Sequence, residues 1–376
     1  MIRRGSNPDS LYSRIKAIIE EARTNVLRTV NTEIVRAYWL IGRELVKTQQ
    51  QGRARAPYGG ELIETIAERL QNECGKGFTA TNLNYMRLFY QTFPHLLSTE
   101  KRHASRDRLS ESQPPSKIRH ALRDEFFIPG TLNPSLSWTH YRLLTKVESD
   151  HARAFYEIEA VKNRWSSREL ERQIDSLLYE RLAKRRDTRG TLALARRGQE
   201  IQSPKDAIKD PVVLEFLGIP ESPRLVESKL EEALLNHLHQ FLLELGRGFS
   251  FVDRQQRLTL DGDHFYVDLV FYHTILECYV LIDLKVQKLT HADLGQMQLY
   301  VNYYDEHRRT KGDNPTVGLI LCTDKNAAMV KYTLGKGNRQ IFVSRYKLYF
   351  PTEKELVHEL RRELQEIRRL HWNQQE

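Results

Sequence analysis

Apolar residues recur every three or four positions through most of the first half of the chain, which is the spacing of an amphipathic helix. Leu11 to Arg28 begins this pattern and Ile34 to Leu45 continues it. The pattern predicts an all-helical N-terminal domain over residues 8–184. Its other helical stretches are Glu61–Asn72, Thr81–Thr92, Ser137–Lys146, Ala152–Val161 and Ser167–Lys184.

Two places in this half have the shape of a helix-turn-helix. A predicted helix is followed by Gly75-Lys76-Gly77, and Thr79 and Thr81 then open the next helix. Ser137 begins another short helix further along the chain. Polar and basic residues at helix starts suit contacts with nucleic acid, although plain helical bundles contain the same shapes. DNA reading and simple bundle packing are therefore both open for this half.

The second half changes to strand-like segments that are rich in β-branched and aromatic residues. Helical patterns precede, interrupt and follow them, in the order αβββαβαβα. This order predicts a mixed sheet flanked by helices, so the whole chain is expected to be α+β with two domains. The predicted strands are Phe249–Leu260, His264–His273, Glu277–Val286, Pro315–Thr323 and Gln340–Phe350, and the predicted helices are Val226–Leu245, Ala292–His307, Ala327–Thr333 and Thr352–Leu370.

Two polar stretches divide the chain further. Residues 98–119 are rich in Ser, Arg, Lys and Pro and almost lack apolar residues, which is typical of a mobile, basic insertion. Residues 185–203 are also polar, and we expect them to link the helical domain to a second domain over 204–376. The length of 376 residues agrees with two or three domains.

Charge is unevenly distributed between the two halves. Residues 1–200 carry 35 lysines and arginines against 24 acidic residues, whereas residues 201–376 carry 23 against 25. This asymmetry is expected where one part binds a polyanion and the other carries carboxylates for chemistry, and it also fits an ordinary basic surface.

Several classes of protein are disfavoured. No apolar run approaches the roughly 18 residues that cross a bilayer, and no apolar segment follows the basic N-terminus as in a secretion signal. The glycine-rich turns that contain a lysine lack the spacing of a nucleotide-binding phosphate loop. His237 and His239 point in different directions on one predicted helix, which disfavours a zinc pair. We expect a cytoplasmic protein without a membrane segment, a motor or a zinc pair. Three scattered cysteines are too few for a disulfide framework: Cys74, Cys278 and Cys322.

Two carboxylates and a lysine fall on adjacent predicted strands. Alternation puts Val267 and Leu269 on one face of the first strand and Asp268 on the other. On the next strand Asp283 and Lys285 share a face, about 7 Å apart. Burying these groups is costly unless they pair or bind a metal. A half-buried ion pair is one explanation, and a Mg²⁺ site for phosphodiester hydrolysis is the other.

Side chains of two predicted helices converge on the same place. Glu231 lies in line with an inward apolar stripe, whereas Glu232 lies on the solvated face of that helix. Gln296 and Tyr300 are four residues apart beside the core stripe of the second helix. Decoration of a helix surface is the alternative explanation for this last pair.

These residues, in this order, resemble the PD-(D/E)xK nuclease superfamily with a QxxxY helix. The residues on which this resemblance rests are Glu231, Asp268, Asp283-Leu284-Lys285 and Gln296-Met297-Gln298-Leu299-Tyr300. The resemblance is closer to one branch, the YhcG-like nucleases of bacteria, and it implies a helical domain followed by a restriction-endonuclease-like domain. The stretches that resemble this branch are 38–42, 77–78, 82–87, 136–138, 168–174, 242–249, 254–257, 265–269 and 318–322.

The resemblance implies a deoxyribonuclease that depends on Mg²⁺ or Mn²⁺. Asp268 and Asp283 would bind the metal, and Lys285 would serve the attacking water. Relatives often have Glu where this chain has Asp283, and the superfamily admits either. The remaining implied roles are further metal ligation by Glu231 and the Leu284 carbonyl, and support of the metal site or the DNA by Gln296 and Tyr300.

The expected partners are DNA, a second copy of the chain, and a partner motor or restriction–modification protein. The resemblance implies a mobile-element or phage-defence setting. The competing hypothesis is a DNA-binding or scaffold subunit whose nuclease site is retired. Retired copies usually lose the lysine or an acid, whereas this chain keeps Asp268, Asp283 and Lys285. The sequence therefore favours an active nuclease.

Overall fold

The computed structural model describes residues 8–51, 56–97, 129–184, 186, 188–220, 225–325, 327–335, 337–352, 354–356 and 358. The basic insertion predicted over 98–119 lies outside the described residues, as does most of the helix predicted over Thr352–Leu370. The chain divides into two compact units, Met1–Glu171 and Arg172–Glu376. None of the helices in the described ranges has the length and apolarity to cross a membrane.

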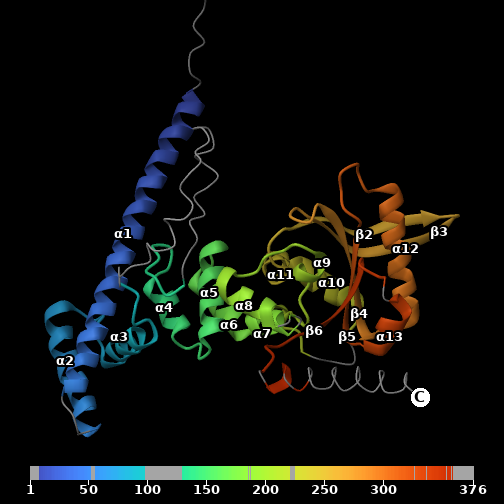
Figure 1. The fold of residues 1–376 in the computed structure, drawn as a ribbon. Helices are drawn as coiled ribbons and strands as arrows, with labels where there is room; N and C mark the ends of the chain where they lie inside the picture. The colour runs from blue at the N-terminus through green and yellow to red at the C-terminus, as the bar shows by residue number, and fades with distance from the viewer. Residues whose placement is uncertain are drawn as a thin grey trace, which may run out of the picture. The chain divides into compact units, whose positions relative to one another are not determined.

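The first unit is built from helices, as the apolar pattern predicted (Figure 1). The two segments predicted separately around residue 30 form one continuous helix, α1. Gly42 of α1 allows close approach to α3, because a Cβ at this position would overlap the Met86 carbonyl. The helices of this unit are α1 (Pro8–Gln51), α2 (Ala56–Cys74), α3 (Ala80–Thr92), α4 (Trp138–Leu144) and α5 (Asp150–Lys162), with α6 (Ser167–Asp175) at the division between the units.

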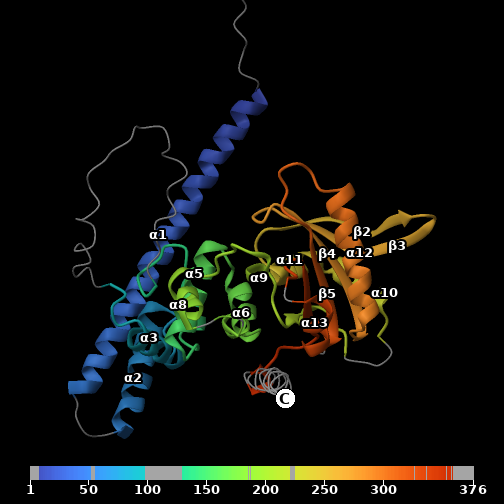
Figure 2. The same cartoon turned by 45° about the vertical axis from the view of Figure 1, so that its right-hand side comes forward.

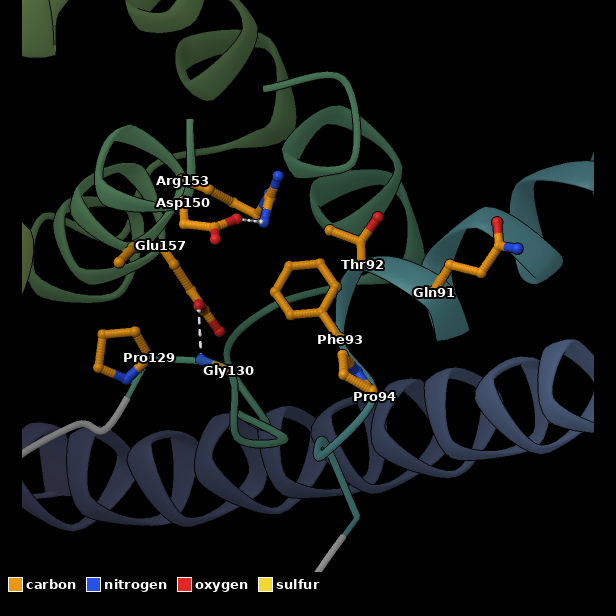
Figure 3. A pocket seen from close by; sticks show the side chains of 10 residues that line it. Gln91, Thr92, Phe93, Pro94, Pro129, Gly130, Asp150, Arg153 and Glu157 are labelled. Carbon is orange, nitrogen blue, oxygen red and sulfur yellow. Dashed lines mark hydrogen bonds and ion pairs between the residues drawn. The ribbon is translucent and has the colours of Figure 1, made fainter. Parts of the chain in front are cut away.

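A hollow of about 590 Å³ opens in this unit between the end of α3 and α5 (Figure 3). Glu157 of α5 lines it and is only 1% exposed. Its Oε2 accepts a hydrogen bond from the Gly130 N–H at 2.8 Å. Burial raises the pKa of Glu157 to about 8, and the bond from Gly130 and the charge of Arg153 oppose this shift only in part. The Glu157 carboxyl is therefore protonated near neutral pH.

The second unit contains a six-stranded sheet in the order β1-β6-β5-β4-β3-β2. Strands β2, β3 and β4 form an antiparallel meander, and strands β1, β5 and β6 run parallel to β4. The two residues of β1 are too few to show a pattern, and the sequence did not predict this strand. The strands are β1 (Val212–Val213), β2 (Phe249–Leu260), β3 (Asp263–His273), β4 (Cys278–Lys288), β5 (Val317–Asp324) and β6 (Ile341–Lys347).

Helices cover both faces of this sheet (Figures 1 and 2). One apolar cluster joins α10 and α11 to Ile282 and Leu284, and the other joins α12 and α13 to Leu281 and Ile320. The single helix predicted over Val226–Leu245 is broken at His237, where the backbone leaves the helical region. The covering helices are α10 (Glu227–Asn236), α11 (Leu238–Leu245), α12 (His291–His307) and α13 (Ala327–Leu334).

Strand β3 changes face at Asp268, so the simple alternation predicted for it is wrong there. Val267 packs with the α12 cluster, as does Val270, whereas Leu269 packs with the α10–α11 cluster. The register pairs Arg254 with Leu269 and Gln256 with Val267, which leaves Gln255 of β2 opposite Asp268. Gln255 has a left-handed φ of 44°, which is rare for a residue with a side chain. The change of face therefore involves both strands.

The segment predicted as a linker over 185–203 contains a helix, because Leu194 and Ala195 are buried. The helix predicted over Ser167–Lys184 is divided by Leu177, whose φ is 53°. The short helices of this region are α7 (Leu178–Ala183), α8 (Thr188–Arg197), α9 (Pro204–Ala207) and the 3₁₀ turn η2 (Glu215–Leu217).

A buried ion network joins Arg172 to the second unit. The carboxylate of Glu244 is fully buried and lies 2.6 Å from Arg181 and 3.2 Å from Arg172. It also accepts a hydrogen bond from the Val213 N–H at 2.9 Å. The network thus attaches the end of α6 and α7 to α11 and β1.

Candidate active site

Asp268 lies where β3 and β4 separate. The regular pairing of the two strands ends at Leu269 and Ile282. Beyond that point the Leu284 N–H donates a hydrogen bond to Asp268 Oδ2 at 2.7 Å. The side chain of Asp268 thus takes the place of a backbone acceptor, and the acid is fixed to the strand that carries Asp283 and Lys285.

Asp283 and Lys285 share one face of β4, as the alternation predicted. Lys285 Nζ lies 2.9 Å from Asp283 Oδ2. Burial, followed by the charge of Asp268, raises the pKa of Asp283 to about 7. Burial disfavours the charge of Lys285, yet the neighbouring Asp283 raises the pKa of Lys285 above its usual value. The ion pair that the sequence predicts as one explanation is present, beside the half-buried carboxylate of Asp268.

Glu231 of α10 reaches Asp268 through Gln255, a residue that the sequence did not predict to be part of the site. Gln255 Nε2 donates to Glu231 Oε2 at 2.6 Å and to Asp268 Oδ1 at 3.0 Å. Burial raises the pKa of Glu231, and the bond from Gln255 opposes that shift. Glu231 is buried and Glu232 exposed, as the helical pattern predicted. The sequence signal that could have identified Gln255 is its position opposite Asp268 in the register of the β2–β3 hairpin.

Tyr300 and Gln296 support β3 from the other face of the sheet. Tyr300 is fully buried, so surface decoration is the wrong explanation for it. Its hydroxyl donates to the Tyr266 carbonyl at 2.9 Å and accepts a hydrogen bond from Gln296 Nε2. The pair therefore holds the backbone two residues before Asp268.

The donor set suits a hard divalent cation. Asp283 is buried and Asp268 is half-buried, and the charge of Asp268 disfavours that of Asp283. A cation between them would offset this repulsion, and Mg²⁺ is commonly held by one or two carboxylates together with substrate phosphate. Within the described ranges no three His, Cys, Asp or Glu side chains are arranged to hold a metal. Two carboxylates are thus the core of the candidate site, and Glu231 joins them through Gln255.

Comparisons with known proteins cover both halves of the chain. Residues 205–365 match the family model described as the YhcG PDDEXK nuclease domain, and residues 14–181 match the DUF1016 N-terminal domain. The Escherichia coli (strain K12) protein named "Putative nuclease YhcG" is 39% identical over 356 residues, which cover 93% of this chain and 92% of the relative.

A solved structure titled as a repair endonuclease from Pyrococcus abyssi is also similar to part of the chain. The match has 20% identity and a TM-score of 0.23, and it covers 35% of this chain and 50% of that chain.

Proposed function

The chain belongs to the YhcG family of PDDEXK nucleases, and we propose that it is a metal-dependent deoxyribonuclease that hydrolyses phosphodiester bonds in DNA. The observation that carries this proposal is the meeting of Asp268, Asp283 and Lys285 where β3 and β4 separate. A buried carboxylate (Asp283) and a half-buried one (Asp268) beside a lysine fit a site that binds a phosphate through a cation.

Asp268 and Asp283 would hold Mg²⁺ or Mn²⁺, with the Leu284 carbonyl and Glu231 as further candidates. When bound, the metal supplies Lewis-acid stabilisation of the charge on the phosphate. The Leu284 N–H fixes one oxygen of Asp268 and the Gln255 amide contacts the other. Asp268 is thereby oriented before any ligand arrives.

Lys285 would act through the positive charge of its ammonium group. Its pKa is raised by Asp283, so the ammonium stays protonated at neutral pH. A protonated lysine can donate hydrogen bonds to water or to a phosphate oxygen and stabilise the negative charge of the transition state. Asp283 orients this ammonium at 2.9 Å.

Tyr300 and Gln296 would hold the site together without touching the reacting atoms. The Tyr300 hydroxyl is bonded to the Tyr266 carbonyl, and Gln296 is bonded to that hydroxyl. Both residues therefore act on Asp268 through the β3 backbone.

The basic first half would bind DNA or a partner protein, in a cytoplasmic setting related to mobile elements or phage defence. A second copy of the chain and a partner motor or restriction–modification protein are the proposed protein partners. The excess of lysine and arginine in residues 1–200 supports a polyanionic partner for this half.

The test is cleavage of supercoiled and linear DNA by the purified chain in Mg²⁺ or Mn²⁺, compared with the Lys285→Ala variant. Metal-dependent cutting that Lys285→Ala loses supports the proposal. Tight DNA binding with no cutting in either metal would instead support the retired-subunit hypothesis.

A further inference from the structure

Gln255 joins two acids that come from different parts of the second unit. Its Nε2 lies 2.6 Å from Glu231 of α10 and 3.0 Å from Asp268 of β3. An amide nitrogen carries two hydrogens, and here each is directed to a different carboxylate. Gln255 is therefore a cross-link between the helix and the strand.

The backbone of Gln255 is held in an unfavourable conformation. Its φ of 44° lies in the left-handed region, inside a strand. This conformation costs free energy for a residue with a Cβ, and such positions are often found at functional sites. Glycine would adopt the same φ without that cost.

Packing does not explain the presence of a glutamine at this position. Gln255 is exposed, and it is not part of either apolar cluster of the sheet. The neighbouring Gln256 lies on the same strand, and its amide donates to the Arg257 carbonyl at 3.4 Å and, among the described residues, to neither acid. The contacts with the two acids are thus what distinguishes position 255.

We infer that Gln255 is a positioning residue of the nuclease site. It holds Glu231 beside Asp268 and orients the Asp268 carboxylate toward the cation that Asp268 and Asp283 would share. This inference rests on the proposed function. The geometry supports it, because the one amide nitrogen of Gln255 is within hydrogen-bond distance of both acids.

The inference can be tested with Mn²⁺ alone, by measuring its affinity for the full chain by electron paramagnetic resonance. The variants are Gln255→Gly, Gln255→Ala and the matched control Gln256→Ala. Loss of a group that orients a metal ligand typically lowers metal affinity about 10- to 100-fold. We expect that loss in both Gln255 variants and an unchanged affinity in Gln256→Ala.

Two further readouts separate positioning from folding. The melting temperature of Gln255→Gly should equal or exceed that of the wild type, because glycine relieves the backbone strain. In cleavage assays kcat should fall about tenfold or more, while KM for DNA stays within about twofold of the wild type.

The inference is overturned if Gln255→Gly binds Mn²⁺ as tightly as the wild type, or if the wild type itself binds none. It is also overturned if Gln255→Gly loses affinity only together with its melting temperature. Failure of the proposed function looks different, because the wild type would then bind Mn²⁺ and cut no DNA. In that case the affinities of the Gln255 variants still decide the inference.

Discussion

The Asp268 carboxylate accepts a hydrogen bond from the Leu284 backbone at 2.7 Å, which fixes the acid of one strand to the next strand. Leu284 lies between Asp283 and Lys285, so this single bond sets the position of Asp268 relative to both. The spacing of the three side chains is thus controlled by the backbone of β4.

Lys285→Ala should lower cleavage at least about 100-fold, which is comparable with removing one oriented electrostatic group. The ammonium contacts Asp283 at the edge of the site, so DNA affinity and melting temperature should change little. Single-turnover cleavage and thermal unfolding measure the two effects. Lys288→Ala, an exposed residue on the same strand, is the control and should behave like the wild type. Normal cutting by Lys285→Ala would refute the catalytic role, and unfolding would indicate a purely structural ion pair.

Removal of divalent metal should abolish cleavage. Asp268 and Asp283 offer hard oxygen ligands, so Mg²⁺ or Mn²⁺ should restore activity after EDTA treatment, whereas Ca²⁺ should support DNA binding with poor turnover. Gel assays before and after EDTA measure this. Persistent cutting in excess EDTA would rule out the proposed metal site.

Glu244→Ala should destabilise the second unit by about 3–5 kcal/mol, because Arg172 and Arg181 would keep their charges without the buried carboxylate. Burial disfavours the charge of Glu244. The charges of Arg181, Lys209 and Arg172 outweigh this effect and lower the pKa of Glu244 to about 2. The carboxylate therefore stabilises the fold above its unfolded pKa, roughly 4.3, and this contribution is lost as pH falls toward 2. Urea unfolding at several pH values tests both points, with exposed Glu232→Ala as the control.

Glu157 should make the first unit less stable as pH rises, which is the opposite of the effect of Glu244 on the second unit. Its folded pKa of about 8 exceeds its unfolded value, so the folded state binds more protons between these values. Stability should fall as pH rises through this window and level off above about pH 8. Glu157→Gln removes the ionisation and should exceed the wild type in stability at pH 9 by more than about 1.4 kcal/mol, the equivalent of one pKa unit. Equal pH profiles of stability for the wild type and Glu157→Gln would contradict the raised pKa of Glu157.

The first unit should supply much of the DNA affinity. Residues 1–171 carry 27 lysines and arginines against 20 acidic residues, so this fragment should bind duplex DNA with a steep salt dependence. The fragment should end at Glu171, because Arg172 belongs to the buried network of the second unit. Fluorescence anisotropy at several salt concentrations measures the slope. Absence of binding at low salt would point to oligomerisation or partner binding instead.

The sequence by itself determined the helical first half, the mixed sheet and the identity of the acids and lysine. Helical and strand periods are local properties, and the pair Asp283 and Lys285 shares a face because strand residues alternate. The inward position of Glu231 followed in the same way from the helical period.

Only the tertiary structure decided how these parts meet. The face change at Asp268 depends on the left-handed backbone of Gln255 on another strand, and Gln255 reaches Glu231 only when α10 packs on the sheet. The attachment of Arg172 to the second unit depends on Glu244, a residue 72 positions away in the sequence. Contacts between residues so far apart leave no periodic signal, because each side chain is compatible with its own local pattern wherever its partner lies.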